Sequence, residues 1–310
     1  MDVIRGSKEI PAGLLGAVVT IGNFDGVHLG HRFIFRKLIE EARREERPAV
    51  VITFEPHPKM ILHPERRPFY LITSLEEKIR LLENLGIDAL ILIPFSLEYA
   101  RTTAEEFIRS VLWESFRIRK ILIGHDYTFG RGKEGNAAFL IAFGGRLGFA
   151  VEVMDAFKVG DTTVSSTRIR IALLAGEVRL AAALLGRPYN LGGLVVPGKN
   201  RGIRLGFPTA NLQPDKELAP ARGVYAVYAL LDGNRLPGVL NIGFNPTFAD
   251  ETLSIEVHLF DFHENIYGKP MEILFIERIR DELRFDSPEE LIAQIDVDII
   301  RAREILKEGP

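Results

Sequence analysis

GNFDGVHLGH, residues 22–31, is the stretch that decides the fold of the first half of the chain. It follows the apolar run VVTI at residues 18–21 and leads into a segment with helical periodicity. A strand, a glycine-rich turn and a helix in this order are typical of a parallel sheet covered by helices. The amides of such a turn and the helix N-terminus favour a bound phosphate. The stretch therefore predicts an α/β domain with a phosphate site near its start.

The residues after this stretch continue the same alternation. Short apolar runs at residues 50–54, 89–95, 120–124 and 149–154 alternate with longer segments that suit helices. One such helix is predicted from Ser74, which forms a capping box with Glu77, to a stop at Gly86. Gly186 and Pro188 then break a last helix. We therefore predict a Rossmann-like domain with a parallel sheet over residues 1–186.

The second half, residues 187–310, has a different texture. Glycine, proline and asparagine separate short strands at residues 191–196, 223–231, 235–243, 253–260 and 271–279. Closely spaced strands with turn signals predict an antiparallel β-barrel. Residues 287–307 begin with Ser-Pro-Glu-Glu and carry an apolar stripe, which predicts one C-terminal helix packed on the barrel.

Composition limits the class of protein. The 310 residues include 39 Lys and Arg against 42 Asp and Glu, a net charge of −3, which offers no general attraction for nucleic acid or an anionic membrane. The absence of cysteine excludes disulfides and thiolate metal sites. No apolar run reaches the ~18 residues needed to span a bilayer. We expect a cytoplasmic protein that binds small molecules, with neither nucleic acid nor membrane as a partner.

Two histidines give the first stretch a possible chemistry. His28 and His31 are three residues apart, so both can project from the first helical turn toward one point. Ring N–H donors there suit an oxyanion that gains charge in a transition state. Two alternatives stay open at this point: a glycine-rich turn with two surface histidines, and half of a metal site whose further ligands are not at ligand spacing nearby.

His28, Gly30 and His31 match the HxGH motif of the nucleotidylyltransferase superfamily, and the longer GNFDGVHLGH resembles the adenylyltransferase module of bacterial bifunctional riboflavin kinase/FAD synthetases. SSTRIR at residues 165–170 and GHDYTFG at residues 124–130 resemble two further blocks of that family. The resemblance implies His28 and His31 as catalytic residues. It implies ATP contacts from Gly22, Asn23, Phe24, Asp25, Gly26, His28, His31, Asp126, Ser166, Thr167 and Arg170.

The same resemblance implies where the flavin of this module lies. FEPHP at residues 54–58 resembles the family's flavin turn, with Phe54, Pro56 and Pro58 as contacts. Tyr127 replaces the family's usual Phe and keeps an aromatic wall. By pattern alone, residues 54–58 are a stiff exposed loop and SSTRIR is a helix N-cap followed by two arginines.

Residues 193–199 formally match the start of a P-loop, but this reading fails on chemistry. Asn200 stands where Ser or Thr must bind magnesium, and the run leads into a glycine-rich loop rather than a helix.

Pro208-Thr209-Ala210-Asn211 is more specific, because it resembles the PTAN motif of riboflavin kinases. That resemblance implies ATP contacts from Gly198, Gly202, Gly206, Pro208, Thr209 and Asn211. Thr209 and Asn211 would also help to place Mg²⁺, which keeps several waters and uses substrate phosphate as a ligand. Without the resemblance the segment is an irregular loop in which Asn211 forms a turn.

The strand at residues 253–260 carries the candidate base. Its period of two places Glu256 on the polar face, opposite Ile255 and Val257, where a carboxylate is ordinarily just solvated. IEVH resembles the kinase family's E-x-H strand, which implies Glu256 as general base and flavin contact. Arg280 is a further flavin contact implied by the resemblance.

These observations predict an enzyme that phosphorylates riboflavin to FMN with ATP and Mg²⁺ in the barrel, then transfers AMP from a second ATP to FMN in the first domain. Its ligands would be riboflavin, FMN, FAD and ATP. Two alternatives remain: a non-catalytic flavin-binding carrier or regulator, and a nucleotidylyltransferase for another phosphorylated acceptor.

Overall fold

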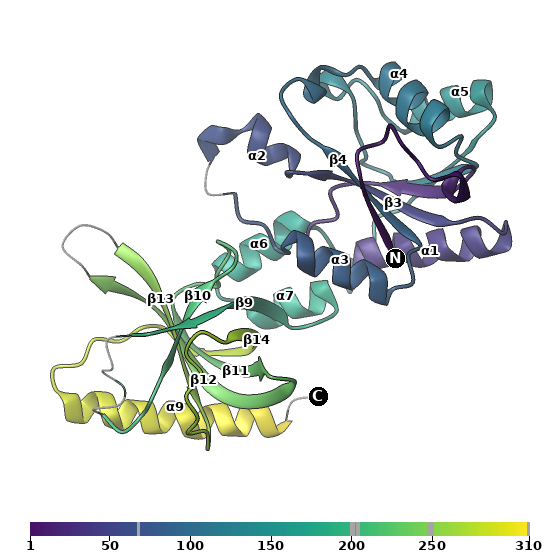
Figure 1. The fold of residues 1–310 in the computed structure, drawn as a ribbon. Coiled ribbons are helices and arrows are strands. Elements are labelled where there is room, and N and C mark those ends of the chain that lie inside the picture. The colour runs from purple at the N-terminus through teal and green to yellow at the C-terminus, as the bar shows by residue number, and fades with distance from the viewer. Residues whose placement is uncertain (67–68, 199–201, 203–204, 247–250, 309–310) are drawn as a thin grey trace. The chain divides into compact units, whose positions relative to one another are not determined.

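A computed structural model describes residues 1–66, 69–198, 202, 205–246 and 251–308 (Figure 1). Contacts group the chain into two compact units. Unit 1 comprises Met1–Phe69 and Thr73–Ser165, and unit 2 comprises Tyr70–Ile72 and Ser166–Pro310.

A parallel sheet forms the centre of unit 1. Among the described residues it has six strands: β1 (Asp2–Arg5), β2 (Val18–Ile21), β3 (Ala49–Glu55), β4 (Ala89–Pro94), β5 (Lys120–Gly124) and β6 (Ala150–Met154). Their order across the sheet is β1-β4-β3-β2-β5-β6, and every neighbouring pair is parallel. The chain moves outward from β2 through β3 to β4, then returns to place β5 on the other side of β2. This confirms the predicted Rossmann-like sheet.

Helices connect these strands. They are α1 (Leu29–Arg44), α2 (Pro58–Leu62), α3 (Leu75–Asn84), α4 (Ala104–Phe107), which continues as a π helix over Ile108–Ser115, and α5 (Ala137–Leu147). Short 3₁₀ turns lie at Ala12–Leu14, Pro64–Arg66, Tyr99–Arg101 and Arg131–Lys133, and a small hairpin joins β7 (Lys158–Val159) to β8 (Thr162–Thr163). The predicted start of α3 is confirmed, since the Ser74 hydroxyl accepts from the Glu77 N–H at 3.1 Å.

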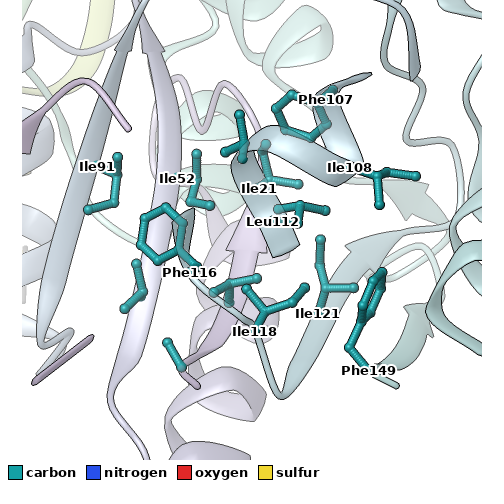
Figure 2. Close-up of a cluster of buried hydrophobic side chains, with 14 of the residues drawn as sticks. Ile21, Ile52, Ile91, Phe107, Ile108, Leu112, Phe116, Ile118, Ile121 and Phe149 are labelled. Carbon is teal, nitrogen blue, oxygen red and sulfur yellow. The ribbon is translucent and has the colours of Figure 1, made fainter. Parts of the chain in front are cut away.

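Alternate residues of the strands enter two hydrophobic clusters, one on each face of the sheet. Ile21, Ile52 and Ile91 pack with side chains from α4, the π helix and α5 (Figure 2). The neighbouring strand residues, such as Val18 and Val51, pack instead with α1 and α3. Because both faces are covered, the strands are apolar throughout, and that is why the sequence indicated them as continuous apolar runs.

A closed antiparallel barrel forms the centre of unit 2. Its strands are β9 (Tyr189–Val196), β10 (Ala210–Pro214), β11 (Gly223–Leu231), β12 (Asn234–Pro246), β13 (Glu251–Leu259) and β14 (Pro270–Arg280). They close in the order β10-β13-β12-β11-β14-β9. Helix α9 (Pro288–Glu308) packs on the barrel through Ala302, Ile305 and Leu306. The predicted barrel and C-terminal helix are therefore confirmed.

Helices α6 (Ser166–Leu174) and α7 (Val178–Leu185) also belong to unit 2. Helix α7 packs against β9 and β14, and Arg179 on it forms an ion pair with Glu277 of β14 at 2.5 Å. The compact units therefore divide at Ser165, and the domain boundary near Arg187 stays a prediction. Gly186 is the left-handed C-cap of α7, so the breaker marks the end of a helix rather than the end of a compact unit.

Among the described strands, β1, β10 and the two short hairpin strands β7 and β8 were not predicted. β1 is a four-residue edge strand that pairs with β4, and β10 contains Asn211, which we had placed in an irregular loop. No helix within the described ranges is long and apolar enough to cross a membrane.

Candidate active sites

Three predicted motifs meet at the carboxyl ends of neighbouring strands in unit 1. Residues 22–31 follow β2, residues 54–58 span the end of β3, and residues 124–130 extend from the end of β5. Since β3, β2 and β5 are adjacent and the chain reverses direction across the sheet between β2 and β5, this edge is the topological switch point. Ligands of open α/β sheets bind there.

His28 and His31 lie at the start of α1, where their rings stack. The ring centroids are 3.5 Å apart and the planes differ by 18°. His28 Nδ1 accepts a hydrogen bond from the backbone N–H of His31 at 3.2 Å, which makes His28 the N-cap of α1. The proton of neutral His28 then sits on Nε2. A side chain at Gly30 would press on the His28 ring, so the glycine of the motif leaves room for this arrangement.

The environment of His31 disfavours protonation of its ring. Burial, then the charges of His28 and Lys78, lower the pKa of His31 well below its usual value of 6.5. Its Nδ1 is buried, and no residue that the structure describes hydrogen-bonds to it. Buried polar atoms are ordinarily paired, so a ligand at the helix N-terminus would supply the missing partner.

The turn between β2 and α1 has an unusual backbone. Phe24 and Val27 have φ angles of 47° and 41°, which side chains rarely adopt, above all a β-branched one. Asp25 holds the turn: its Oδ1 accepts from both the N–H and the hydroxyl of Thr73, at 3.1 and 3.3 Å. The Thr73 hydroxyl in turn accepts from the Gly26 N–H at 3.0 Å.

These contacts give Phe24 and Asp25 a role inside the turn. The Phe24 side chain is 4% exposed and packs edge-on against His31, with centroids 5.2 Å apart. A side chain at Gly22 would touch the Phe24 ring. Asp25 is 2% exposed. Their observed contacts shape the loop that carries the histidines, and the ATP contacts that the resemblance implies for both stay a prediction.

An aromatic cluster lies beside this edge of the sheet. Phe54 at the end of β3 contacts Phe95 and Tyr99, with ring centroids 5.7 and 6.1 Å apart. Tyr127 stacks on Phe129 at 5.6 Å. Phe54 and Tyr127 are flavin contacts that the resemblance implies, whereas Phe95 and Tyr99 were not predicted.

The remaining predicted residues of this module have varied surroundings. Asp126 is exposed, next to Gly124 at the end of β5. Pro56 and Pro58 are half-buried, and Pro58 begins α2 behind its N-cap His57.

Ser166, Thr167 and Arg170 belong to unit 2, at the start of α6. Thr167 is exposed, and Arg170 Nε donates to the carbonyl of Tyr70 at 2.6 Å. The assignment of these three to ATP stays a prediction.

The second candidate site lies on the barrel around Glu256. The Thr209 hydroxyl donates to Glu256 Oε2 at 3.3 Å, and the Ser254 hydroxyl donates to Glu256 Oε1 at 2.9 Å. Glu256 pairs with Asn211 of β10 on one side and with Asn241 of β12 on the other. Directly opposed residues share a face of a sheet, so the row Asn211, Glu256, Asn241 places two amides beside the carboxylate.

Close backbone approaches surround this row. A Cβ at Gly198 would collide with the Asn211 amide, and one at Gly202 would collide with the Phe207 carbonyl and approach the Thr209 hydroxyl. Gly206 has a φ of 89°. The Pro208 carbonyl lies 2.8 Å from His258 Nδ1. Lys199 and Asn200 of the P-loop-like run lie outside the described residues.

The resemblance implies ATP binding in unit 2, and replacing Gly198 with alanine is then expected to weaken it. The new methyl group must push the Asn211 amide out of the row, because the space is already filled. We expect a raised KM for ATP in riboflavin phosphorylation, measured by initial rates, with FMN adenylylation unchanged. Gly145→Ala is the control, since a Cβ at this glycine of α5 meets nothing within 4 Å and its φ is not positive; an equal rise in KM in the control would contradict this prediction.

Arg280 is held by the C-terminal helix. Its Nε donates to Asp298 Oδ1 at 2.9 Å and its second terminal nitrogen donates to Asp298 Oδ2 at 2.7 Å. Asp298 is 3% exposed and also accepts from Gln294 at 3.0 Å. The bidentate pair fixes the guanidinium against α9, so a flavin contact by Arg280, which stays a prediction, would use only its remaining donors.

The oxygen-bearing side chains around Glu256 suit a hard cation. Thr209, Asn211 and Glu256 offer oxygen donors, which Mg²⁺ prefers. Within the described residues no group of three or more His, Asp and Glu side chains forms a metal cluster, so a magnesium ion here would depend on phosphate and water for most of its ligands.

Comparisons with known proteins match the two halves of the chain to two different family models. A family model for FAD synthetase matches residues 11–168, and one for riboflavin kinase matches residues 185–306. The bifunctional riboflavin kinase/FMN adenylyltransferase of Escherichia coli K12 is 40% identical over 306 residues, which is 98% of this chain and 97% of that protein. The protein of the same description from Haemophilus influenzae is 39% identical over 304 residues, with 98% of each chain covered.

A solved structure resembles the whole chain. It is described as a macrolide-efflux protein from Streptococcus pneumoniae, is 35% identical, covers 100% of both chains and gives a TM-score of 0.90. That likeness bears on the fold, whereas the efflux activity in its description is said only of that protein.

Proposed function

Since this chain belongs to the bifunctional riboflavin kinase/FMN adenylyltransferase family, we propose that its two reactions take place in two separate sites, one at Glu256 and one at His28 and His31. The enzyme phosphorylates riboflavin to FMN and adenylylates FMN to FAD. The riboflavin kinase match accounts for the barrel, which an adenylyltransferase for another acceptor would leave unexplained.

In the kinase reaction Glu256 acts as the general base. The 5′-hydroxyl of riboflavin is a poor nucleophile at neutral pH, so a carboxylate that accepts its proton favours attack on the γ-phosphorus of ATP. The new P–O bond gives FMN, and the bond to the bridging oxygen breaks to release ADP. The observation that supports this role is the placement of Glu256 between Thr209, Asn211 and Asn241 on one face of the barrel.

Thr209 and Asn211 would hold the magnesium ion of MgATP. Bound Mg²⁺ neutralises phosphate charge and orients the γ-phosphoryl group. One or two neutral protein oxygens are sufficient for an ion that takes its other ligands from phosphate and water.

In the adenylyl transfer the FMN phosphate attacks the α-phosphorus of ATP, and pyrophosphate leaves. The attacking phosphate oxygen is already ionised, so no general base is required. Catalysis then depends on position and on donors aimed at the developing charge. The stacked pair of His28 and His31 at the N-terminus of α1 supports this assignment.

A flavin time course tests the proposal. Purified enzyme with riboflavin, ATP and Mg²⁺ is expected to give FMN first and FAD later, as separated by chromatography. Removing Mg²⁺ with EDTA should stop FMN formation, and excess Mg²⁺ should restore it. Binding of riboflavin and FMN without turnover would contradict the proposal and favour a carrier.

A further inference from the structure

Lys78 is a charged residue on the inner face of α3. Its side chain is 6% exposed, although lysine is rarely buried. Its Nζ donates a hydrogen bond to the backbone carbonyl of Asn23 at 2.9 Å. The same carbonyl accepts from the Thr53 hydroxyl at 3.3 Å. Lys78 therefore links α3 to Asn23, near the start of the turn that leads from β2 to the histidines.

The charges around Lys78 explain why it can be buried. Burial lowers the pKa of Lys78, while the carboxylates of Asp25 and Glu55 act to raise it. Burial raises the pKa of Glu55. The positive charges of Lys78 and Arg5 act to lower this pKa, and the negative charge of Glu76 acts to raise it further. The positive charge of Lys78 also lowers the pKa of His31, as does the charge of His28. The charge of Lys78 is thus coupled to two acidic groups and to the histidine at the start of α1.

The turn needs such support. Its positive φ angles at Phe24 and Val27 are costly conformations that persist only when surrounding contacts enforce them. Asp25 and Gly26 are held through Thr73, whereas Lys78 holds Asn23 at the other end of the turn. Both ties come from the chain segment that ends in α3.

We propose that Lys78 is a positioning residue for adenylyl transfer, which ties the turn to α3 and thereby holds His28 and His31 in their stacked arrangement. This inference rests on the proposed function of the two histidines. Its electrostatic consequence is that the positive charge of Lys78 opposes protonation of His31 and offsets the nearby carboxylates of Asp25 and Glu55.

Activity gives the first readout. Lys78→Met is expected to lower kcat for FAD formation from FMN by about 10–100-fold, because small displacements of reacting groups cost factors of this size. Riboflavin phosphorylation should be unchanged. Lys78→Arg keeps the charge and should recover part of the rate. Arg80→Met makes the same change of charge on an exposed position of α3 and should have no effect.

Titration of His31, followed by NMR of enzyme with isotopically labelled histidine, gives a readout independent of turnover. Lys78→Met and Lys78→Gln should both raise the pKa of His31, since each removes the positive charge, so the loss of FAD formation on acidification should begin at higher pH. Lys78→Arg and Arg80→Met should leave the pKa unchanged. Lys78→Gln also serves if the methionine variant does not fold.

The two proposals fail differently. An unchanged His31 titration and an unchanged rate in Lys78→Met and Lys78→Gln would overturn the positioning role. A His28→Ala enzyme that still makes FAD at the normal rate would instead overturn the role of the histidine pair, whatever the titration shows.

Discussion

Replacing His28 with alanine is expected to lower turnover in FAD formation by about 10²–10³-fold, because it removes a donor aimed at charge that develops in the transition state. Riboflavin phosphorylation should continue, since its candidate residues lie on the barrel. Chromatography of flavins after addition of riboflavin and ATP should therefore show FMN that accumulates without becoming FAD.

His63→Ala is a suitable control for this variant. His63 is an exposed histidine of unit 1 outside the predicted site. Its Nδ1 lies 3.3 Å from Glu65 Oε1. It should leave both reactions unchanged. An equal loss of both reactions in His28→Ala would contradict the assignment of His28 to adenylyl transfer alone.

Replacing Glu256 with glutamine should have the opposite selectivity. Loss of a general base costs about 10²–10⁴-fold, so FMN formation from riboflavin is expected to fall by that factor. The amide retains the size of the side chain and can still contact Thr209 and Ser254, which keeps the barrel surface intact. Initial rates measured with riboflavin and with FMN as alternative substrates separate the two reactions.

Glu264→Gln provides the matched control, because Glu264 is exposed beyond the end of β13. An unchanged kinase rate in Glu256→Gln would remove Glu256 from the role of base. Loss of FAD formation from supplied FMN in the same variant would contradict the separation of the sites.

The sequence was sufficient to predict both architectures because their patterns differ physically. Strands covered on both faces are apolar throughout, as in β3 and β4, whereas barrel strands alternate, as Ile255, Glu256 and Val257 do. Start signals were equally direct: Ser74 caps α3, and the Ser287 hydroxyl accepts from the Glu290 N–H at 3.2 Å. The motifs after β2, β3 and β5 meet because parallel strands present their carboxyl ends at one edge.

Other features depend on contacts that local pattern does not contain. β1 is too short to show periodicity, and β10 is preceded by glycines and a proline that indicate a loop. The grouping of α7 with the barrel depends on packing against β9 and β14. The role of Asp25 in the turn depends on Thr73, 48 residues further along the chain. The role of Phe24 depends on its packing against His31.

The position of Lys78 in the sequence is itself unusual. Leu75, Ile79 and Leu82 form the apolar stripe of α3, and Lys78 occupies the same face three residues after Leu75. A lysine within such a stripe must either find a partner or lose its charge. Here the Asn23 carbonyl and two nearby carboxylates provide the partners.

Mixing the two defective variants tests the central claim of two separate sites most directly. His28→Ala enzyme should supply FMN, and Glu256→Gln enzyme should convert it to FAD, so the mixture with riboflavin, ATP and Mg²⁺ should form FAD after a lag although neither variant does so alone. A mixture that makes neither FMN nor FAD, because each variant has lost both reactions, would contradict the account and show that the two reactions share one site.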